Sequence, residues 1–197
     1  MYKRQLVSTL QAAGIRVEVT REPGGTPLAE DIRDLLVRQS DEPIPEIAEL
    51  LLVFAARSLH VNNVIIPALE AGTWVVSDRF TDSSRAYQGG GRGIPMETIN
   101  RLADWVHGDV RPDLTILLDA PVDIGMQRAG RRGKLDRFEE ERQDFFQRVR
   151  ACYLQLAEEE PDRFVVVDTT GPLEAVKQQV AAIGEQIIIQ NDVKYTV

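Results

Sequence analysis

The sequence predicts an α/β protein with a doubly wound, mainly parallel sheet and helices on both faces. Short apolar or β-branched runs alternate with segments of helical spacing along the 197 residues, which is typical of this class. Glycine and proline fall between the runs, where turns are expected. No repeat, low-complexity tract or long linker interrupts the alternation. We therefore expect one domain over residues 1–197.

Glycines divide the first half of the chain into helices and strands. Gly14 ends a helical segment, and the β-branched alternation after it predicts a strand. Gly72 ends a helical segment with a long apolar stripe. The predicted helices of this half cover residues 6–13, 28–38 and 45–71, the last as one or two helices, and the predicted strands cover residues 15–20 and 73–77.

The second half repeats the alternation of strand and helix. Each apolar run ends at an aspartate, and a helical pattern begins shortly afterwards. The predicted strands cover residues 114–119 and 163–168, the helices cover residues 95–107, 122–130, 138–159 and 173–189, and residues 131–137 form a charged loop.

Composition excludes several classes of protein. The net charge of −8 and the pI of about 4.9 argue against a general nucleic-acid binder. Cys152 is the single cysteine, so no intrachain disulfide forms and a reducing, cytoplasmic setting is expected. No apolar run approaches the roughly 20 residues that span a bilayer, and the first five residues lack the apolar core of a signal peptide. We expect no membrane partner.

The clearest sign of chemistry follows strand 73–77. That apolar run ends in Asp78-Arg79, and a hydroxyl- and glycine-rich segment over residues 83–93 comes next. Ligands of open α/β sheets bind just past the carboxyl ends of the strands. An aspartate there can hold Mg²⁺, and an arginine can clamp a phosphate through two parallel hydrogen bonds.

The loop over residues 21–26 has two interpretations. Pro23-Gly24-Gly25 is a common turn sequence and needs no function. The two glycines also let a ligand approach the backbone closely, and Arg33, one helical face further on, could reach the same cavity.

Phe54 and Arg57 lie one turn apart within the apolar helical segment. A lone phenylalanine is usually a core residue, but an arginine rarely enters an apolar helix face without a partner. Such a pair can stack on a flat base and hydrogen-bond to it. His60 and His107 have no second ligand at metal spacing, so we expect surface or packing roles for both.

Residues 128–139 carry five basic residues and two glycines in an acidic protein. One interpretation is a solvated surface loop. The other is a lid that closes over anionic phosphates, excludes water and supplies positive charge.

Six blocks of this chain resemble bacterial thymidylate kinases, in the family's order and spacing from about Leu6 to Leu173. They are residues 21–26, 54–57, 78–80, 83–93, 111–115 and 135–139. The glycine-rich Ala86-Tyr87-Gln88-Gly89-Gly90-Gly91-Arg92-Gly93 is highly specific. The resemblance implies a P-loop nucleoside monophosphate kinase fold, transfer of phosphate from Mg²⁺-ATP to dTMP, and a homodimer through helices 45–71.

The resemblance also implies roles for individual residues. Phe54 would stack on thymine, Arg57 would bond the base edge, and Tyr87 would lie against the deoxyribose. Arg33 and Arg79 would hold the acceptor phosphate, with Asp78 beside Mg²⁺. The other nucleoside-facing residues would be Glu22, Pro23, Ser84 and Gln88, and the lid arginines that face ATP would be Arg128, Arg131, Arg132 and Arg137.

The chain departs from the family pattern in two places. Many relatives place the stacking aromatic four residues before the arginine, where this chain has Val53; Phe54 stands three before it. Both spacings face one side of a helix. The 197 residues also contain no G-x-x-x-x-G-K-[ST] loop. We therefore expect an incomplete representative that starts inside the first helix, without the first central strand and the P-loop.

The ends of the chain also lack clear family counterparts. Residues 1–5 do not resemble the family's first helix and are expected to be foreign, and the tail from about residue 187 has no clear match. Two alternative functions stay open. One is a deoxynucleoside kinase, whose acceptor is a hydroxyl, and the other is a non-catalytic nucleotide-binding or dimerising remnant.

Overall fold

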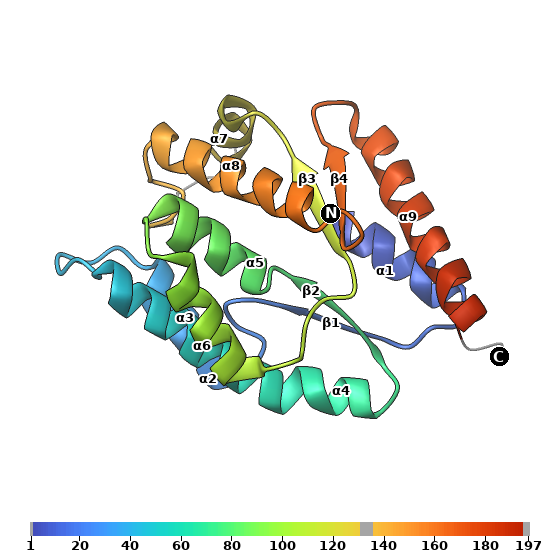
Figure 1. The fold of residues 1–197 in the computed structure, drawn as a ribbon. Coiled ribbons are helices and arrows are strands. Elements are labelled where there is room, and N and C mark those ends of the chain that lie inside the picture. Colours follow the sequence, from blue (N-terminus) through green and yellow to red (C-terminus); the bar gives the residue numbers. More distant parts are fainter. Residues whose placement is uncertain (1, 131–135, 195–197) are drawn as a thin grey trace.

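The computed structural model describes residues 2–130 and 136–194, and within them helices alternate with four short strands (Figure 1). The first half contains helix α1 (Tyr2–Ala12), strand β1 (Val17–Arg21), helices α2 (Pro27–Val37) and α3 (Glu46–His60), π-helix η1 (Val61–Ile65), helix α4 (Ile66–Glu70), strand β2 (Trp74–Asp78), helix α5 (Thr81–Ser84) and π-helix η2 (Arg85–Gly91). The second half contains helix α6 (Met96–His107), strand β3 (Thr115–Asp119), helices α7 (Val122–Gly130) and α8 (Gln143–Glu159), strand β4 (Phe164–Asp168) and helix α9 (Leu173–Lys194).

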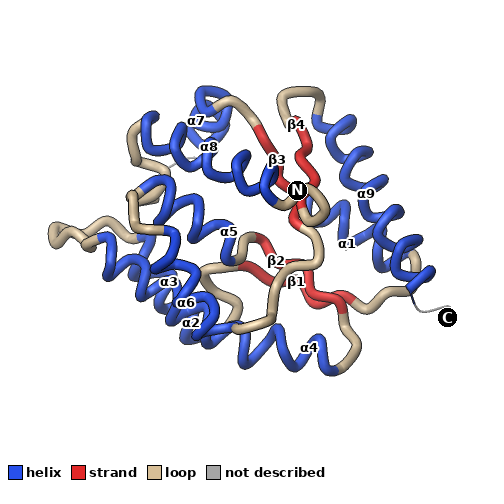
Figure 2. Tube along the Cα trace, viewed as in Figure 1, coloured by secondary structure: helices blue, strands red, loops and turns tan. Residues whose placement is uncertain are grey.

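The strands form two parallel pairs rather than the one sheet that we expected. Strand β1 pairs with β2, and β3 pairs with β4, each in parallel register. Figure 2 shows the two pairs, in red, as separate units. The parallel direction is confirmed, but the continuous sheet is not, because no ladder joins β2 to β3 among the described residues.

Helices cover both sides of the strands, as predicted. Helix α1 packs on β1, β2 and α9, while α9 also packs on β4. Helix α8 contacts β3 and β4 from the opposite side (Figure 1). The strands are nevertheless less buried than the apolar runs predict, and Val19, Leu118 and Val166 are exposed. The reason is that each strand has a single paired neighbour, so neither pair is as wide as the expected sheet.

Two helical segments differ from the prediction. Residues 81–91, for which the sequence pattern predicts neither helix nor strand, form α5 and η2. Helix α8 begins at Gln143, five residues later than expected. The turn before it is fixed by Asp136, whose Oδ1 accepts from the backbone nitrogens of Phe138 and Glu139 at 2.9 Å each. Such side-chain bonds to the backbone compete with continuation of a helix.

Local chemistry explains why α2 begins where it does. The Thr26 hydroxyl accepts from the backbone nitrogen of Ala29 at 3.2 Å, and Pro27 occupies the first position of the helix. Both features are favoured at a helix start. They fix the direction in which α2 leaves the loop over residues 21–26, and so the direction in which it presents Arg33.

The helical stretch over residues 46–70 is more apolar than we expected from the sequence. This stretch is the one described helix long and apolar enough to cross a bilayer, by length and composition alone. We expected none, because no uninterrupted apolar run approaches roughly 20 residues, but the average hydropathy over this stretch tolerates the polar residues Glu49, Arg57 and His60 within it. A buried core helix passes the same test, and all three polar residues are buried against protein partners.

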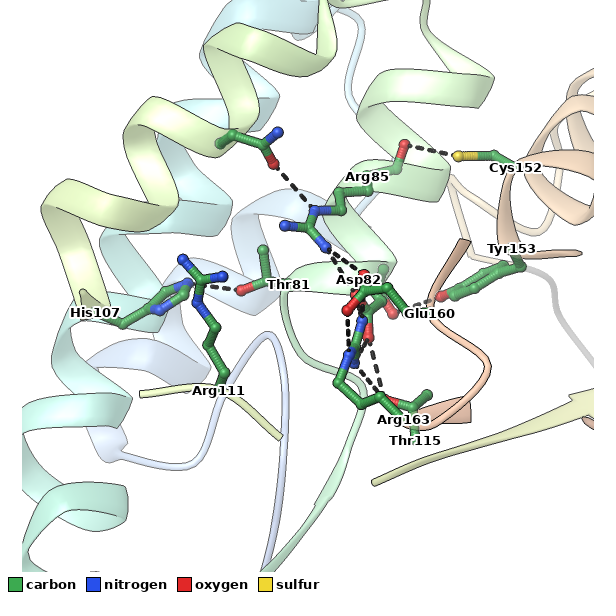
Figure 3. A network of polar contacts seen from close by, with 12 residues as sticks. Thr81, Asp82, Arg85, His107, Arg111, Thr115, Cys152, Tyr153, Glu160 and Arg163 are labelled. Atoms are coloured by element: carbon green, nitrogen blue, oxygen red, sulfur yellow. Dashed lines mark hydrogen bonds and ion pairs between the residues drawn. The ribbon is translucent and has the colours of Figure 1, made fainter. Parts of the chain in front are cut away.

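An ion-pair network ties α5 to the second pair of strands (Figure 3). The Arg163 guanidinium donates to both carboxylate oxygens of Asp82, at 2.7 and 3.0 Å. The Thr115 hydroxyl, at the start of β3, donates to Asp82 at 3.1 Å. Arg163 also pairs with Glu160 at 2.7 Å. Since β2 and β3 do not pair among the described residues, this network is one of the polar links between the halves that hold them.

We predict that Asp82→Asn lowers the free energy of unfolding by about 2–4 kcal/mol, because it leaves the Arg163 charge partly buried beside a neutral amide. Urea denaturation measures this loss. The matched control is Asp104→Asn, which breaks an exposed pair with Arg111 and is expected to cost at most about 1 kcal/mol. Equal losses in free energy of unfolding for the two variants would show that the Asp82–Arg163 pair does not stabilise the contact between the two halves.

Candidate active site

The candidate site lies at the carboxyl ends of β1 and β2. The register places Arg21 opposite Asp78, and the backbone nitrogen of Glu22 donates to the carbonyl of Asp78 at 2.9 Å. Both strands therefore deliver their next residues, Glu22 and Arg79, to the same place. This is where the parallel-strand rule predicted ligand binding.

A buried ion pair crosses the site between its first loop and α3. The Arg57 Nε donates to Glu22 Oε2 at 2.7 Å, and both side chains are almost fully buried. Burial raises the pKa of Glu22, but Arg57 and His60 outweigh it and hold that pKa below its ordinary value of 4.5. Glu22, predicted to face the nucleoside, is therefore a carboxylate that fixes Arg57.

Arg57 keeps one donor unused. Its Nη2 donates to the Ser84 hydroxyl at 3.0 Å, and its guanidinium lies 4.6 Å from the ring centre of Phe54. The side chain is 2% exposed, yet Nη1 has no hydrogen-bond partner within the described part of the chain. A buried guanidinium nitrogen without a partner is costly, so this atom marks a place for an acceptor on a ligand.

Phe54 belongs to the core as well as to the site. It packs in a hydrophobic cluster whose buried members are Leu50, Phe54, Ile94, Ile99 and Ala103. Val53 is buried too. The position of the ring beside Arg57 is compatible with stacking on a base, and the cluster is compatible with a packing role, so the predicted stacking stays a prediction.

Arg79 is held in a strained conformation directly after β2. Its φ is 73°, the one positive value at a non-glycine residue in the described chain. The Arg79 Nη2 donates to the Tyr87 hydroxyl at 3.2 Å, its guanidinium lies 4.8 Å from the Tyr87 ring centre, and the Ser77 hydroxyl donates to its carbonyl at 2.7 Å. Strained residues cluster at functional sites. The structure thus joins Arg79 and Tyr87, which sequence reasoning placed at the phosphate and the sugar.

Positive charge gathers around Arg33. Its Nη1 donates to the carbonyl of Pro23 at 3.1 Å. Burial, and next the charges of Arg21 and then Arg79, lower the pKa of Arg33, although Glu30 and Asp136 oppose the shift. Arginines that raise each other's electrostatic energy are a favourable setting for an anion.

Glu49 is a site residue that sequence reasoning missed. This carboxylate, 1% exposed, accepts from Gln88 at 3.0 Å, from Arg92 at 3.2 and 3.1 Å, and from Arg137 at 2.7 Å. Its sequence signal was a glutamate in the apolar stripe of a helix, where an unpaired charge is rarely found. Gln88 and Arg137, both predicted to touch ligands, are here bound to Glu49.

The lid arginines divide into three cases. Arg137 is anchored, because its Nε also donates to the carbonyl of Leu36 at 2.7 Å. Arg128 donates to the carbonyl of Thr169 at 2.9 Å, on the loop after β4. The predicted contacts of Arg131 and Arg132 with ATP lie outside the described residues.

Asp78 suits a magnesium ion that is held mainly by phosphate and water. Its side chain is 61% exposed and its carboxylate lies 3.7 Å from Lys3 Nζ. No group of three potential metal-ligating side chains occurs among residues 2–130 and 136–194. Mg²⁺ commonly takes only one or two carboxylates besides phosphate oxygens and water, so a single accessible aspartate fits this mode.

His60 was expected to be a surface or packing residue, and it is part of the site. It is fully buried, with Nδ1 2.9 Å from Glu22 Oε1 and Nε2 2.6 Å from the Thr20 hydroxyl. His107 likewise lies 2.7 Å from the hydroxyl of Thr81 (Figure 3). Both histidines are hydrogen-bonded in the interior.

Comparison with known proteins is consistent with this geometry. A family model described as thymidylate kinase matches residues 2–180, so residues 2–5, expected to be foreign, fall within the match. A thymidylate kinase of Pseudomonas fluorescens is 52% identical over 186 residues, 94% of this chain and 89% of the relative. One of Alcanivorax borkumensis is 52% identical over 182 residues, 92% of this chain and 88% of the relative.

A solved structure resembles the fold as well. The crystal structure of thymidylate kinase from Ehrlichia chaffeensis superposes with a TM-score of 0.72 at 31% sequence identity. The match covers 92% of this chain and 88% of that one. The similarity therefore extends over nearly all of both chains.

We predict that Arg79→Gly is more stable than Arg79→Ala by about 1 kcal/mol, because only glycine adopts a positive φ without strain. Both variants lose the Tyr87 contacts, so the difference between their free energies of unfolding reports the cost of the positive φ at residue 79. Arg101 in the middle of α6 is the control, since alanine should be favoured over glycine there by about 0.5–1 kcal/mol. Equal stability of the two Arg79 variants would mean that the backbone stores no strain.

We also predict an acid-sensitive contribution from Glu49. Burial raises its pKa, but hydrogen bonds from Arg92, Gln88 and Arg137 outweigh burial and hold the pKa below 4.5. A carboxylate with a depressed folded-state pKa stabilises the fold above 4.5, and this contribution disappears as the pH falls through the folded-state pKa. Glu49→Gln should therefore be destabilised by about 2–4 kcal/mol at neutral pH, with a gap to wild type that narrows below pH 4.5.

Urea denaturation at a series of pH values measures this difference in free energy of unfolding between wild type and Glu49→Gln. Glu46→Gln, in the exposed first turn of the same helix, is the control and should run parallel to wild type at every pH. If the difference in free energy of unfolding between wild type and Glu49→Gln stays constant from neutral to strongly acidic pH, Glu49 does not have the lowered pKa assigned to it.

Proposed function

The chain belongs to the thymidylate kinase family, and we propose that its site takes dTMP and ATP and forms dTDP and ADP. A phosphate oxygen of dTMP forms the new bond to the γ-phosphorus, and the oxygen that bridged the β- and γ-phosphates leaves with ADP. Because such reactions need positioning and charge stabilisation rather than covalent chemistry by the protein, the roles of the residues follow from where their charges and donors lie.

The observation that carries the proposal is the group of arginines around the acceptor position. Arg33 has its pKa lowered by burial and by its arginine neighbours, and Arg79 is held at the carboxyl end of β2 in a strained conformation. A phosphate monoester between them would relieve the repulsion and accept paired hydrogen bonds. A hydroxyl acceptor, as in a deoxynucleoside kinase, would leave these charges uncompensated, so the site favours a monophosphate.

The nucleoside would lie between Arg79 and α3. The free Nη1 of Arg57 would donate to a base oxygen, with Phe54 beside the base and Ser84 close to the guanidinium. Tyr87, which stacks on Arg79, would lie along the sugar, where it leaves little room for a 2′-hydroxyl. Glu22, Pro23 and Gln88 act behind this surface, because their polar atoms bind Arg57, Arg33 and Glu49 respectively.

We propose that Mg²⁺ and ATP bind near the exposed side chain of Asp78. Asp78 would hold the ion through water or phosphate oxygens, and Mg²⁺ would neutralise charge that builds up on the transferred phosphate. Arg128, which lies on α7 and is hydrogen-bonded to the loop after β4, would approach ATP together with Arg131 and Arg132. Arg137 supports this lid as its anchor on α2 and Glu49.

The donor side carries a finer proposal. The 197 residues contain no G-x-x-x-x-G-K-[ST] segment, and we propose that a strand and loop of this kind belong between the two parallel pairs. The separation of β1–β2 from β3–β4 supports this idea. Backbone amides of such a loop would hold the ATP phosphates, and its lysine would offset developing charge.

We also propose a homodimer in a cytoplasmic setting. Apolar side chains are exposed on α3, with Ile47 at 54% and Leu51 at 53%, and on the neighbouring α2 at Leu28 and Leu35. Burial of this surface against a second copy would follow from the hydrophobic effect. The single, half-buried Cys152 is compatible with a reducing compartment.

Binding of dTMP to residues 1–197, measured by calorimetry, tests the acceptor site. Arg33→Ala should weaken dTMP by about 30-fold or more, consistent with roughly 2–5 kcal/mol for truncating a desolvated charged partner, and should have little effect on thymidine, which lacks the phosphate. Arg16→Ala, a change at an exposed arginine outside the site, is the control. Failure of the wild-type chain to bind dTMP would overturn the proposal.

We predict that purified residues 1–197 bind dTMP without measurable phosphoryl transfer from ATP, because the sequence contains no G-x-x-x-x-G-K-[ST] loop to hold the ATP phosphates. A coupled assay of ADP release measures transfer. Ordinary kinase turnover by this polypeptide would show that the loop is dispensable and that another segment holds ATP.

The stacking role of Phe54 gives a further prediction. If its ring stacks on thymine, Phe54→Ala weakens the binding of dTMP by about 1–3 kcal/mol more than it weakens the binding of 2-deoxyribose 5-phosphate, which has no base. A core role instead lowers the melting temperature and weakens both ligands alike. Val53→Ala is the control, and selective weakening of dTMP by that variant alone would assign the stacking position to residue 53.

A further inference from the structure

We propose that His60 is a positioning residue for base recognition: through the carboxylate of Glu22 it keeps the Arg57 guanidinium free to bind the nucleobase. The inference rests on the proposed function, because it assigns the unused Nη1 of Arg57 to a base oxygen. It concerns a residue that touches neither ligand and would act through two others.

The contacts form one buried chain from β1 to α5. The Thr20 hydroxyl lies 2.6 Å from His60 Nε2, and His60 Nδ1 lies 2.9 Å from Glu22 Oε1. The other oxygen of Glu22 accepts from Arg57 Nε at 2.7 Å, and Arg57 Nη2 donates to Ser84 at 3.0 Å. Each oxygen of the Glu22 carboxylate therefore has its own partner.

The donor and acceptor roles follow from the carboxylate. An ionised Glu22 can only accept, so Nδ1 of His60 carries the proton in this contact. In the neutral ring Nε2 then accepts from the Thr20 hydroxyl. This arrangement fixes both the tautomer and the plane of the imidazole, and with it the orientation of the carboxylate.

The consequence for Arg57 is a choice between two pairings. A carboxylate with two available oxygens tends to take a guanidinium through two parallel hydrogen bonds. Because His60 occupies Oε1, Glu22 takes Arg57 through Nε alone. The remaining nitrogens of Arg57 then serve Ser84 and, at Nη1, a position with no partner among the described residues.

The glycine loop is shaped to admit this histidine. Gly25 has a φ of 92°, and a Cβ at that position would lie 2.3 Å from Cδ2 of His60. The loop that supplies Glu22 thus passes directly over the imidazole ring. A side chain at residue 25 would displace His60, and His60 is in turn the contact that fixes Glu22.

The experiment compares two ligands across substitutions at residue 60. His60→Leu fills the space but cannot donate, whereas His60→Asn places an amide near the position of Nδ1. Binding to residues 1–197 is measured by NMR titration for dTMP and for 2-deoxyribose 5-phosphate, which lacks the base. We expect His60→Leu to raise the Kd for dTMP at least 10-fold, His60→Asn to recover most of that loss, and the Kd for the base-free ligand to change less than 3-fold.

Two further variants sharpen the test. Thr20→Val removes the contact at Nε2 but leaves Nδ1 and Glu22 in place, and should change the dTMP Kd less than 3-fold. Arg57→Ala removes the group on which His60 acts, so adding His60→Leu to Arg57→Ala should cause no further loss of dTMP binding.

Several outcomes would overturn the inference. His60→Leu and His60→Asn could raise the Kd for dTMP equally, or His60→Leu could raise the Kd for both ligands together. His60→Leu could also raise the Kd for dTMP further in the Arg57→Ala background. Each of these results points to a packing role alone. Unchanged dTMP binding in His60→Leu, with a wild-type chain that binds dTMP, refutes the inference and leaves the proposed function standing. If the wild-type chain binds no dTMP, the proposed function itself is wrong.

Discussion

The buried pairing of Glu22 with Arg57 is the contact on which the rest of the site depends. It joins the loop after β1 to the last turn of α3 across 35 residues of sequence, and both side chains are nearly inaccessible to solvent. Burial of an ion pair is favourable only when every remaining donor and acceptor is satisfied. His60 and Ser84 meet most of that requirement, which leaves one guanidinium nitrogen for a ligand.

A second buried carboxylate, that of Glu49, organises another part of the candidate site. Glu49 binds Gln88 and Arg92 from the glycine-rich segment and Arg137 from the segment before α8. Helix α3 thus carries both Arg57 and Glu49, a cation and an anion two turns apart, and each collects partners from a different segment. The apolar stripe of this helix supplies the packing, and its polar interruptions arrange the site.

The sequence was sufficient for most of the secondary structure and for the parallel direction of the strands, whereas the location of the site stays a prediction. Each predicted strand is present within two residues at either end, and Asp78 and Arg79 follow the end of β2, beside the end of β1. Periodicity could not show that β2 and β3 remain unpaired, because pairing depends on distant segments. It also could not assign His60 or Glu49, since a buried titratable residue is recognisable only from the partners that tertiary structure brings to it.

The most direct test of the account is a crystal structure of residues 1–197 with dTMP. The account predicts the phosphate between Arg33 and Arg79, and an oxygen of thymine within hydrogen-bonding distance of Arg57 Nη1, with Glu22 still bound to His60. A nucleotide bound elsewhere, or a thymine ring that leaves Nη1 of Arg57 without a partner, would contradict it.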